Sequence, residues 1–184
     1  MDVLKLYGQA QDGFDAAVAD VEPDRWDTPS PCAGWSVRDV AGHVTWAQRQ
    51  LRAWATGEDY DQPGGPGTPH PAAVLADADP LAAWREARAD ATDVLTAEAL
   101  TRPTPIPGMG EVPLIAIVRL LITDTTVHSW DIGRLTLDPE LVSASFDWSR
   151  QNIMRRPGFF GPELTPPDDA DEQTRLLAFL GRKA

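Results

Sequence analysis

The chain has a single cysteine, Cys32, among its 184 residues, so no internal disulfide can form. Basic residues are also few: 16 Lys and Arg stand against 28 Asp and Glu, which gives a net charge of −12 at pH 7. A field of that sign repels nucleic acid and anionic lipid, so neither is expected as a partner. The sequence has no apolar run of membrane-spanning length and no signal-peptide segment at its N-terminus. We therefore expect a cytoplasmic protein.

The spacing of apolar residues predicts a helical protein. Where apolar side chains recur every three or four residues, one helix face packs on a core. Five stretches show this spacing: 4–21, 36–56, 80–100, 113–135 and 138–154. No segment alternates convincingly like a strand. We expect one all-α domain, 1–184, built as a four-helix bundle with a fifth helix beside it. The tail 155–184 is expected to pack on the bundle, mostly extended, with an additional short helix near 171–180.

Local signals mark several helix starts. Ser36 is expected to cap the second helix, with Asp39 three residues later in an acidic variant of the capping box. Two other helices are expected to begin where an aspartate cap precedes a proline at the first helical position. These pairs are Asp79-Pro80 and Asp138-Pro139.

The predicted helix 113–135 carries polar groups where apolar side chains are expected. Asp124 and His128 interrupt its core-facing stripe one helical turn apart, so both side chains lie on the same face. An unpaired charge in that position would be costly and needs compensation. The two side chains could satisfy each other by hydrogen bonding, or they could bind a metal ion together with a third ligand.

His43, on the predicted helix 36–56, is the candidate third ligand. Helical bundles commonly build metal sites from side chains on facing helices. Two neutral imidazoles and one carboxylate suit Zn²⁺, Ni²⁺, Fe²⁺ or Mn²⁺. Three protein ligands leave at least one position open for water or substrate, which is typical of a catalytic site. The spacing alone leaves both interpretations open: a metal site at His43, Asp124 and His128, or a hydrogen-bonded pair.

The sequence allows two interpretations each for Cys32 and Asp39, and it suggests no role for His70. Cys32 lies ahead of a helix start, which would favour a reactive thiolate, but we expect a small packed residue. Asp39 is four residues before His43 and could orient it, but we expect a helix cap. His70 lies in a loop rich in glycine and proline and is given no role.

The remaining candidates lie near the predicted ligands or in the tail. Asp131 and Arg134 are expected to form an ion pair at the surface or helix end, with Arg134 beside an anionic substrate as the alternative. Gln11 either lines the site or is a hydrogen-bonded core residue. Phe159 and Phe160 are expected to hold the tail on the bundle. Four tryptophans are expected to pack the bundle and shield the site rather than bind substrate: Trp35, Trp46, Trp54 and Trp130.

Several runs of the sequence resemble a known family. The run WDTPSPCAGWSVRDVAGHV, residues 26–44, followed by TDTTVHSWDIGR, residues 123–134, resembles the DinB-like superfamily. Within it, the chain is most similar to the metal-binding domain of the mycothiol-dependent maleylpyruvate isomerases of actinobacteria. The run RRPGFFGPELTPPDDADEQTRLLAFLG, residues 155–181, resembles the end of small actinobacterial metal-binding proteins of that kind.

The resemblance implies a four-helix bundle that holds one divalent metal, zinc first and nickel second. His43 matches the histidine that ends the G-W-x-V-R-D-x-x-x-H run, and His128 matches the histidine of the V-H-x-W-D run. Asp124 matches the acidic ligand one turn before it, where the isomerase has a glutamate. Mycothiol is the cosubstrate that the resemblance implies.

The function implied is that of a thiol S-transferase or isomerase, which activates a small thiol at the open metal position for reaction with a small-molecule substrate. Because the isomerase has a C-terminal domain for which this chain has too little length, we expect a substrate other than maleylpyruvate. A non-catalytic metal-binding or small-ligand-binding protein and a metal-dependent hydrolase are the alternatives. Dimers occur among DinB-like proteins, so a homodimer is compatible with the resemblance.

Overall fold

The computed structural model describes residues 2–106, 110–153, 155 and 159–184. Met154, where the sequence predicts the end of the fifth helix, lies outside the described residues. Most of the described chain is helical, which confirms the predicted all-α class. Within the described residues, no helix combines the length and apolarity needed to cross a membrane. The elements in chain order are α1 (Val3–Ala19), α2 (Val37–Thr56), the short 3-10 helix η1 (Pro71–Leu75), α3 (Pro80–Asp93), α4 (Ala97–Thr101), β1 (Pro103–Ile106), β2 (Gly110–Pro113), α5 (Leu114–Gly133), α6 (Pro139–Asn152) and α7 (Glu172–Phe179).

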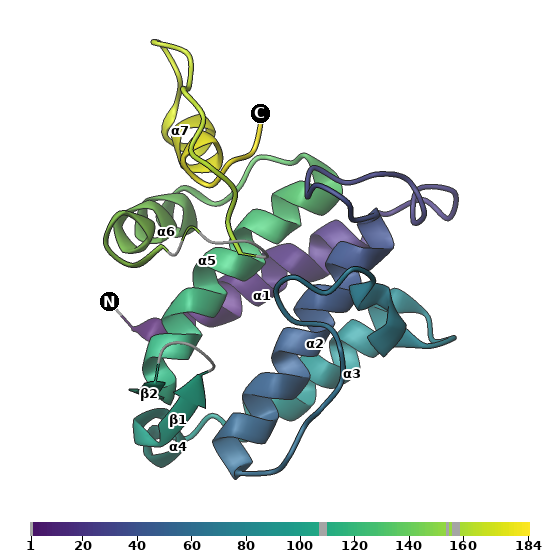
Figure 1. Ribbon diagram of the computed structural model, residues 1–184, viewed down its shortest axis with the longest axis vertical. Coiled ribbons are helices and arrows are strands. Elements are labelled where there is room, and N and C mark those ends of the chain that lie inside the picture. Colours follow the sequence, from purple (N-terminus) through teal and green to yellow (C-terminus); the bar gives the residue numbers. More distant parts are fainter. Residues whose placement is uncertain (1, 107–109, 154, 156–158) are drawn as a thin grey trace.

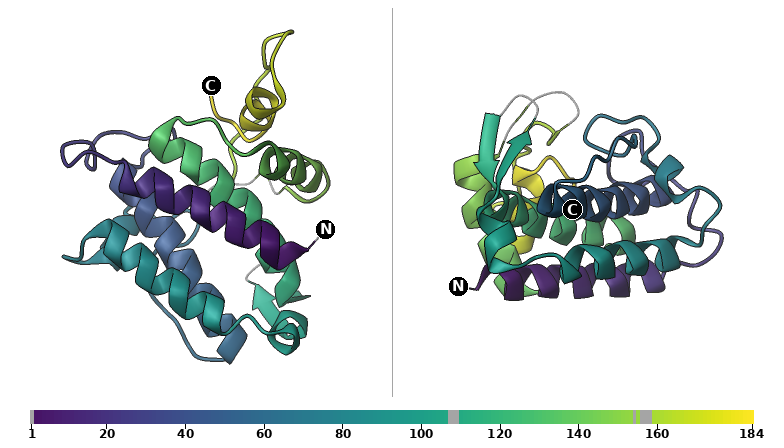
Figure 2. Two further views of the ribbon diagram at one scale, coloured as in Figure 1. Left: turned by 180° about the vertical axis from the view of Figure 1, so that it is seen from behind. Right: turned by 90° about the horizontal axis from the view of Figure 1, so that it is seen from below.

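The four long helices α1, α2, α3 and α5 pack as a bundle (Figure 1, Figure 2). Helix α1 packs against α3 and α5, and α2 packs against the same two helices. The consecutive helices α1 and α2 therefore lie across the bundle from each other, joined by the long connection 20–36. Helix α6 packs on the outside of α5, and α7 packs on α6 (Figure 1). This arrangement agrees with the predicted bundle and its additional C-terminal helix, and it makes α2 and α5 direct neighbours.

The predicted helix starts are confirmed. The Ser36 hydroxyl accepts a hydrogen bond from the Asp39 N–H at 3.1 Å, and the Asp39 carboxylate accepts one from the Ser36 N–H at 3.0 Å. This reciprocal capping box fixes the first turn of α2. Asp79 and Asp138 cap α3 and α6 through their side chains, each followed by proline at the first helical position.

Two predictions about the secondary structure were wrong. The stretch 80–100 forms two helices, because α3 ends at Asp93 and the Thr96 hydroxyl starts α4 by accepting a hydrogen bond from the Ala99 N–H. The connection 103–113 contains the antiparallel hairpin β1–β2, although the sequence shows no segment that alternates convincingly like a strand. Its strands have four residues each and contain prolines, so they are too short to show an alternating pattern.

The loop between α2 and α3 lies against α2 next to His43. Asp39, besides capping α2, accepts a hydrogen bond from the Ala72 N–H at 3.2 Å. Gly42 makes this close approach possible, because a Cβ atom there would lie 2.5 Å from the Pro71 carbonyl oxygen and 2.7 Å from the Ala72 Cα. Both are backbone atoms, which cannot move aside as a flexible side chain would. The position of this loop over α2 therefore depends on the missing side chain of Gly42.

Gly42→Ala is expected to destabilise the protein by about 1–3 kcal/mol, the usual cost of overpacking a filled site. The matched control is Gly13→Ala in α1, where an added Cβ would meet nothing within 4 Å. That change is expected to be neutral or to stabilise by up to about 1 kcal/mol, because alanine favours a helix over glycine. Urea unfolding followed by circular dichroism compares the two. Equal effects of the two substitutions on stability would contradict the close packing of the loop against Gly42.

Candidate metal centre

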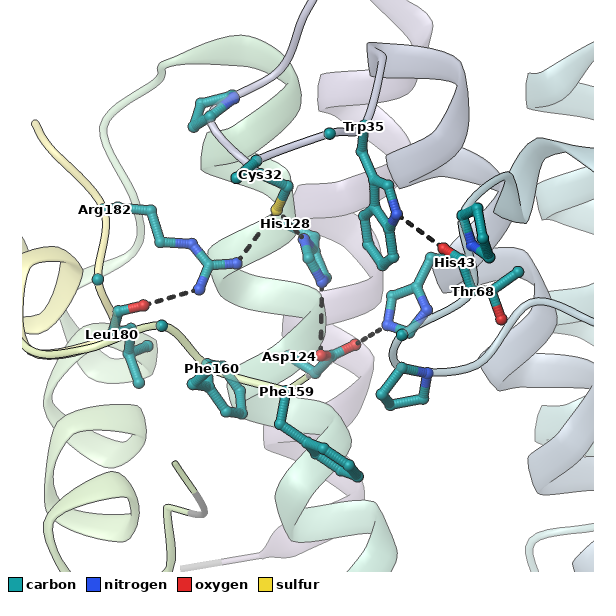
Figure 3. A pocket seen from close by; sticks show the side chains of 18 of the residues that line it. Cys32, Trp35, His43, Thr68, Asp124, His128, Phe159, Phe160, Leu180 and Arg182 are labelled. Atoms are coloured by element: carbon teal, nitrogen blue, oxygen red, sulfur yellow. Dashed lines mark hydrogen bonds and ion pairs between the residues drawn. The ribbon is translucent and has the colours of Figure 1, made fainter. Parts of the chain in front are cut away.

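His43, Asp124 and His128 meet between α2 and α5. The His43 Nε2 lies 3.6 Å from the Asp124 Oδ2, and the His128 Nε2 lies 3.5 Å from the Asp124 Oδ1. Both histidines are buried. Figure 3 shows the two imidazole rings directed at the Asp124 carboxylate from two sides. The structure therefore brings together the three residues that the sequence selected from two distant segments.

A backbone carbonyl of the α2–α3 loop orients His43. The His43 Nδ1 lies 2.7 Å from the Gly64 carbonyl oxygen. A carbonyl oxygen can only accept, so Nδ1 is the donor, and in the neutral ring Nε2 keeps its lone pair. The loop thus fixes which nitrogen of His43 faces Asp124.

A buried carboxylate orients His128 in the same way. The His128 Nδ1 donates to the Asp131 Oδ2 at 2.8 Å, one turn further along α5. The Asp131 side chain is fully buried. A carboxylate on the far nitrogen of a histidine sets its tautomer and makes the near nitrogen a stronger ligand. Both imidazoles therefore present Nε2 to the Asp124 carboxylate.

Asp131 is the centre of a wider hydrogen-bond network. The Arg182 guanidinium donates to its two oxygens at 3.0 and 3.4 Å, and the Cys32 thiol donates to Oδ2 at 3.1 Å. Arg182 also donates to the Cys32 Sγ at 3.3 Å. We call these four residues, Cys32, His128, Asp131 and Arg182, the Asp131 network. It joins α5 to the connection before α2 and to the segment after α7.

The charges in the site hold one another in their ionised forms. Burial by itself would raise the pKa of Asp124, but the charges of His128 and His43 outweigh it and hold that pKa well below its ordinary range. Burial would lower the pKa of His128, but the Asp124 carboxylate in particular raises it well above its ordinary value. A cation entering the site must therefore displace a proton from His128.

The donor set fits a divalent metal ion. The separations of 3.5 and 3.6 Å are long for hydrogen bonds. They are close to the roughly 3.3 Å between neighbouring ligand atoms around a tetrahedral zinc ion. The Asp124 Oδ2 is also buried without a hydrogen-bond partner in the described part of the chain, a costly state that a bound cation would relieve. These residues could hold a metal with little rearrangement, and their role as ligands stays a prediction.

A second group of potential ligands is less suitable. Cys32, His128 Nδ1 and Asp131 also offer ligand atoms that lie within 4.8 Å of one another. Arg182, however, donates hydrogen bonds to both Cys32 and Asp131. A metal ion there would have to displace this guanidinium and its positive charge.

A cavity of about 660 Å³ opens beside Asp124 and the two histidines. This volume lies within the range of small-molecule sites. Trp35 covers one side, and its indole N–H donates to the Thr68 carbonyl oxygen at 2.9 Å. Phe159 and Phe160 lie on the opposite side in Figure 3. Leu120, one turn before Asp124 on α5, also lines the cavity. A ligand in the cavity would reach the candidate metal position directly.

Several interpretations of individual residues need correction. Asp131 was predicted to form a surface or helix-end ion pair with Arg134, but it is buried and pairs with Arg182. Cys32 packs against the core as predicted, but it also lines the cavity and donates a hydrogen bond to Asp131. Arg134 instead lies over the Trp130 ring, 4.4 Å from its centroid.

Other interpretations are resolved by the same contacts. Gln11 is a core residue that donates to the Gln48 side chain at 3.0 Å. Phe159 and Phe160, predicted only to hold the tail, line the cavity. His70, which was given no role, is exposed at the cavity rim.

Arg182 is the site residue that the sequence did not indicate. It lies 51 residues from Asp131 in a short basic end of the chain, outside any helical pattern. The position of Asp131, three residues after His128, could have signalled an orienting carboxylate, because i and i+3 share a helix face.

Comparison with curated proteins identifies full-length relatives. An uncharacterised protein of Mycobacterium tuberculosis (strain ATCC 25618 / H37Rv) is 31% identical over 193 residues, covering 99% of this chain and 98% of the relative. Its counterpart in strain CDC 1551 / Oshkosh matches equally. A second uncharacterised protein of H37Rv is 38% identical over 47 residues, which is 26% of this chain and 18% of that protein.

Solved structures show the same fold. The crystal structure of the mycothiol-dependent maleylpyruvate isomerase matches with a TM-score of 0.61 and 16% identity, covering 82% of this chain and 72% of that one. A mutant of the same enzyme matches with a TM-score of 0.59.

The family comparison confirms the resemblance read from the sequence. The model of the mycothiol maleylpyruvate isomerase N-terminal domain matches residues 7–133, a range that includes His43, Asp124 and His128. This range is most of the chain, and the two Mycobacterium tuberculosis relatives that are 31% identical match 99% of its length. The chain therefore belongs to the mycothiol maleylpyruvate isomerase N-terminal domain family.

Proposed function

We propose that this protein is a metal-dependent enzyme that activates a small thiol of the mycothiol type, and that it transfers this thiol to a small electrophile or uses it to isomerise one. The observation that carries the proposal is the convergence of His43, Asp124 and His128 at the edge of a cavity large enough for a small molecule. The family, and the name of the structural relative, support mycothiol as the thiol. We propose zinc as the metal, with nickel as the second candidate.

The chain's own residues would do most of the positioning. The Nε2 atoms of His43 and His128 and the Asp124 carboxylate would hold the metal, and the Gly64 carbonyl and Asp131 keep the two rings in place. A divalent metal bound there would supply the positive charge that favours the thiolate form of a thiol at neutral pH. The aromatic walls of the cavity would hold the electrophile beside the sulfur and keep water away.

Metal content tests the ligand assignment. Purified protein reconstituted with zinc is expected to retain about one ion per chain, as a three-ligand site requires. His43→Ala and His128→Ala are expected to lose it. His70→Ala is the matched control, because this histidine is exposed on the cavity rim, and it should keep the full metal content. Asp131→Asn is expected to weaken zinc binding by about 10–100-fold, the usual effect of removing an orienting partner.

Elemental analysis after gel filtration measures retained metal, and circular dichroism establishes that each variant is folded. Wild-type protein that retains no metal, or a folded His128→Ala variant that retains as much as wild type, would contradict the assignment.

Zinc affinity is expected to rise with pH above 6.5, the ordinary pKa of histidine. The raised pKa of His128 keeps its imidazole protonated in the metal-free protein, and zinc must displace that proton. The stability of the metal-free protein should change in the opposite direction. Its His128–Asp124 pair is fully formed below pH 6.5 and is lost as pH rises through the raised pKa. Competition with a zinc chelator and thermal unfolding measure the two trends. A zinc affinity that does not change over this range would contradict the account.

Thiol consumption tests the activity. Zinc-loaded protein is mixed with mycothiol and a panel of small electrophiles, and loss of free thiol is followed. Turnover is expected to depend on mycothiol and zinc together, and to disappear with a chelator or in His128→Ala. Metal binding without turnover on any electrophile would favour a non-catalytic binding protein. Hydrolysis of an ester without need for thiol would favour a metal-dependent hydrolase.

A further inference from the structure

The Arg182 side chain lines the cavity, but its positive charge is paired with a carboxylate inside the protein. Arg182 is only 9% exposed. Its guanidinium contacts both oxygens of Asp131, donates to the Leu180 carbonyl oxygen at 2.9 Å and donates to the Cys32 Sγ at 3.3 Å. The paired carboxylate cancels its charge, and most of its N–H groups already have acceptors. Arg182 therefore offers little to an incoming anion.

The other charges at the cavity also balance. Among the described residues that line it, Asp124 and Arg182 are the only Asp, Glu, Lys or Arg side chains. With the Arg182–Asp131 pair neutral, a divalent ion at the candidate centre would be matched by Asp124 and one bound thiolate. A further negative charge would find no free Lys or Arg side chain among the described residues that line the cavity, and an unpaired charge among apolar side chains is costly.

The walls of the cavity are suited to aromatic and apolar groups. The ring of Trp35 lies 5.0 Å from the ring of His43 and 6.2 Å from that of His128, measured between centroids. The indole N–H of Trp35 donates a hydrogen bond to the Thr68 carbonyl oxygen, so Trp35 offers the cavity its ring surface rather than a free hydrogen-bond donor. Phe160 and Leu120 extend the apolar lining. Flat rings stack favourably on such surfaces.

We propose that the second substrate of this site is an uncharged electrophile with an aromatic or apolar body, and that the cavity discriminates against carboxylates. This inference rests on the proposed function, because it concerns the molecule that meets the activated thiol. Maleylpyruvate, which the structural relative's name gives as its substrate, carries two carboxylates and would not match this cavity.

Ligand binding without turnover tests the proposal. The probes are 2-naphthamide and 2-naphthoate, which have nearly the same shape and differ by one charge. Calorimetric titration uses zinc-loaded protein saturated with mycothiol and, separately, metal-free protein. In both forms 2-naphthamide is expected to bind at least ~10-fold more tightly than 2-naphthoate, which corresponds to a difference of about 1.4 kcal/mol in binding free energy. Equal or tighter binding of 2-naphthoate in both forms would overturn the proposal.

Leu120→Arg adds an unpaired cation to the same cavity. Leu120 is half-buried on α5, one turn from Asp124. This variant is expected to reduce the preference for 2-naphthamide by ~10-fold or more, since a free guanidinium pairs well with a carboxylate. Leu120→Met is the matched uncharged variant and should keep the wild-type preference. The same preference in Leu120→Arg as in wild type would contradict control by charge.

The two proposals fail separately. If mycothiol does not bind the zinc-loaded protein but the metal-free protein still prefers 2-naphthamide, the proposed function is wrong and the charge preference of the cavity stands. If mycothiol turnover is observed but the two probes bind equally, the proposed function stands and the substrate class is wrong.

Discussion

The candidate centre depends on the hydrogen bonds and ion pairs that the buried carboxylate of Asp131 makes. Its side chain has 0% exposure, and it accepts hydrogen bonds from His128 at 2.8 Å, Arg182 at 3.0 Å and Cys32 at 3.1 Å. Without these partners, a negative charge at this depth would destabilise the fold strongly. One charge therefore holds together α5, the connection before α2 and the segment after α7.

This arrangement couples the orientation of a candidate ligand to the wall of the cavity. His128 uses Nδ1 for Asp131 and presents Nε2 to Asp124, so its ring links the Asp131 network to the candidate centre. The segment that brings Arg182 to Asp131 also lines the cavity with Leu180 and Gly181. Loss of the Arg182 contact would leave the buried negative charge of Asp131 without one of its positive partners. It would also open one side of the cavity. Because of the same pair, the described residues that line the cavity include no free guanidinium, which is the basis for the proposed uncharged substrate.

The sequence predicted the features that depend on local spacing. The separation of Asp124 and His128 placed both on one face of α5, and the capping residues placed the starts of α2, α3 and α6. It did not predict the features that depend on contacts between distant segments. Nothing near Arg182 indicates that it reaches Asp131, and Gly64 acts through a carbonyl group that every residue possesses. The hairpin β1–β2 has strands too short and too rich in proline to show a pattern.

Anomalous X-ray diffraction at the zinc edge, from crystals of the zinc-loaded protein, would locate the metal and identify its ligands. We expect one zinc ion bonded to the Nε2 atoms of His43 and His128, at about 2.0–2.1 Å, and to an Asp124 oxygen. We also expect Asp131 to stay paired with Arg182. A zinc ion bound instead by Cys32, the Nδ1 of His128 and Asp131, with Arg182 displaced, would contradict the account.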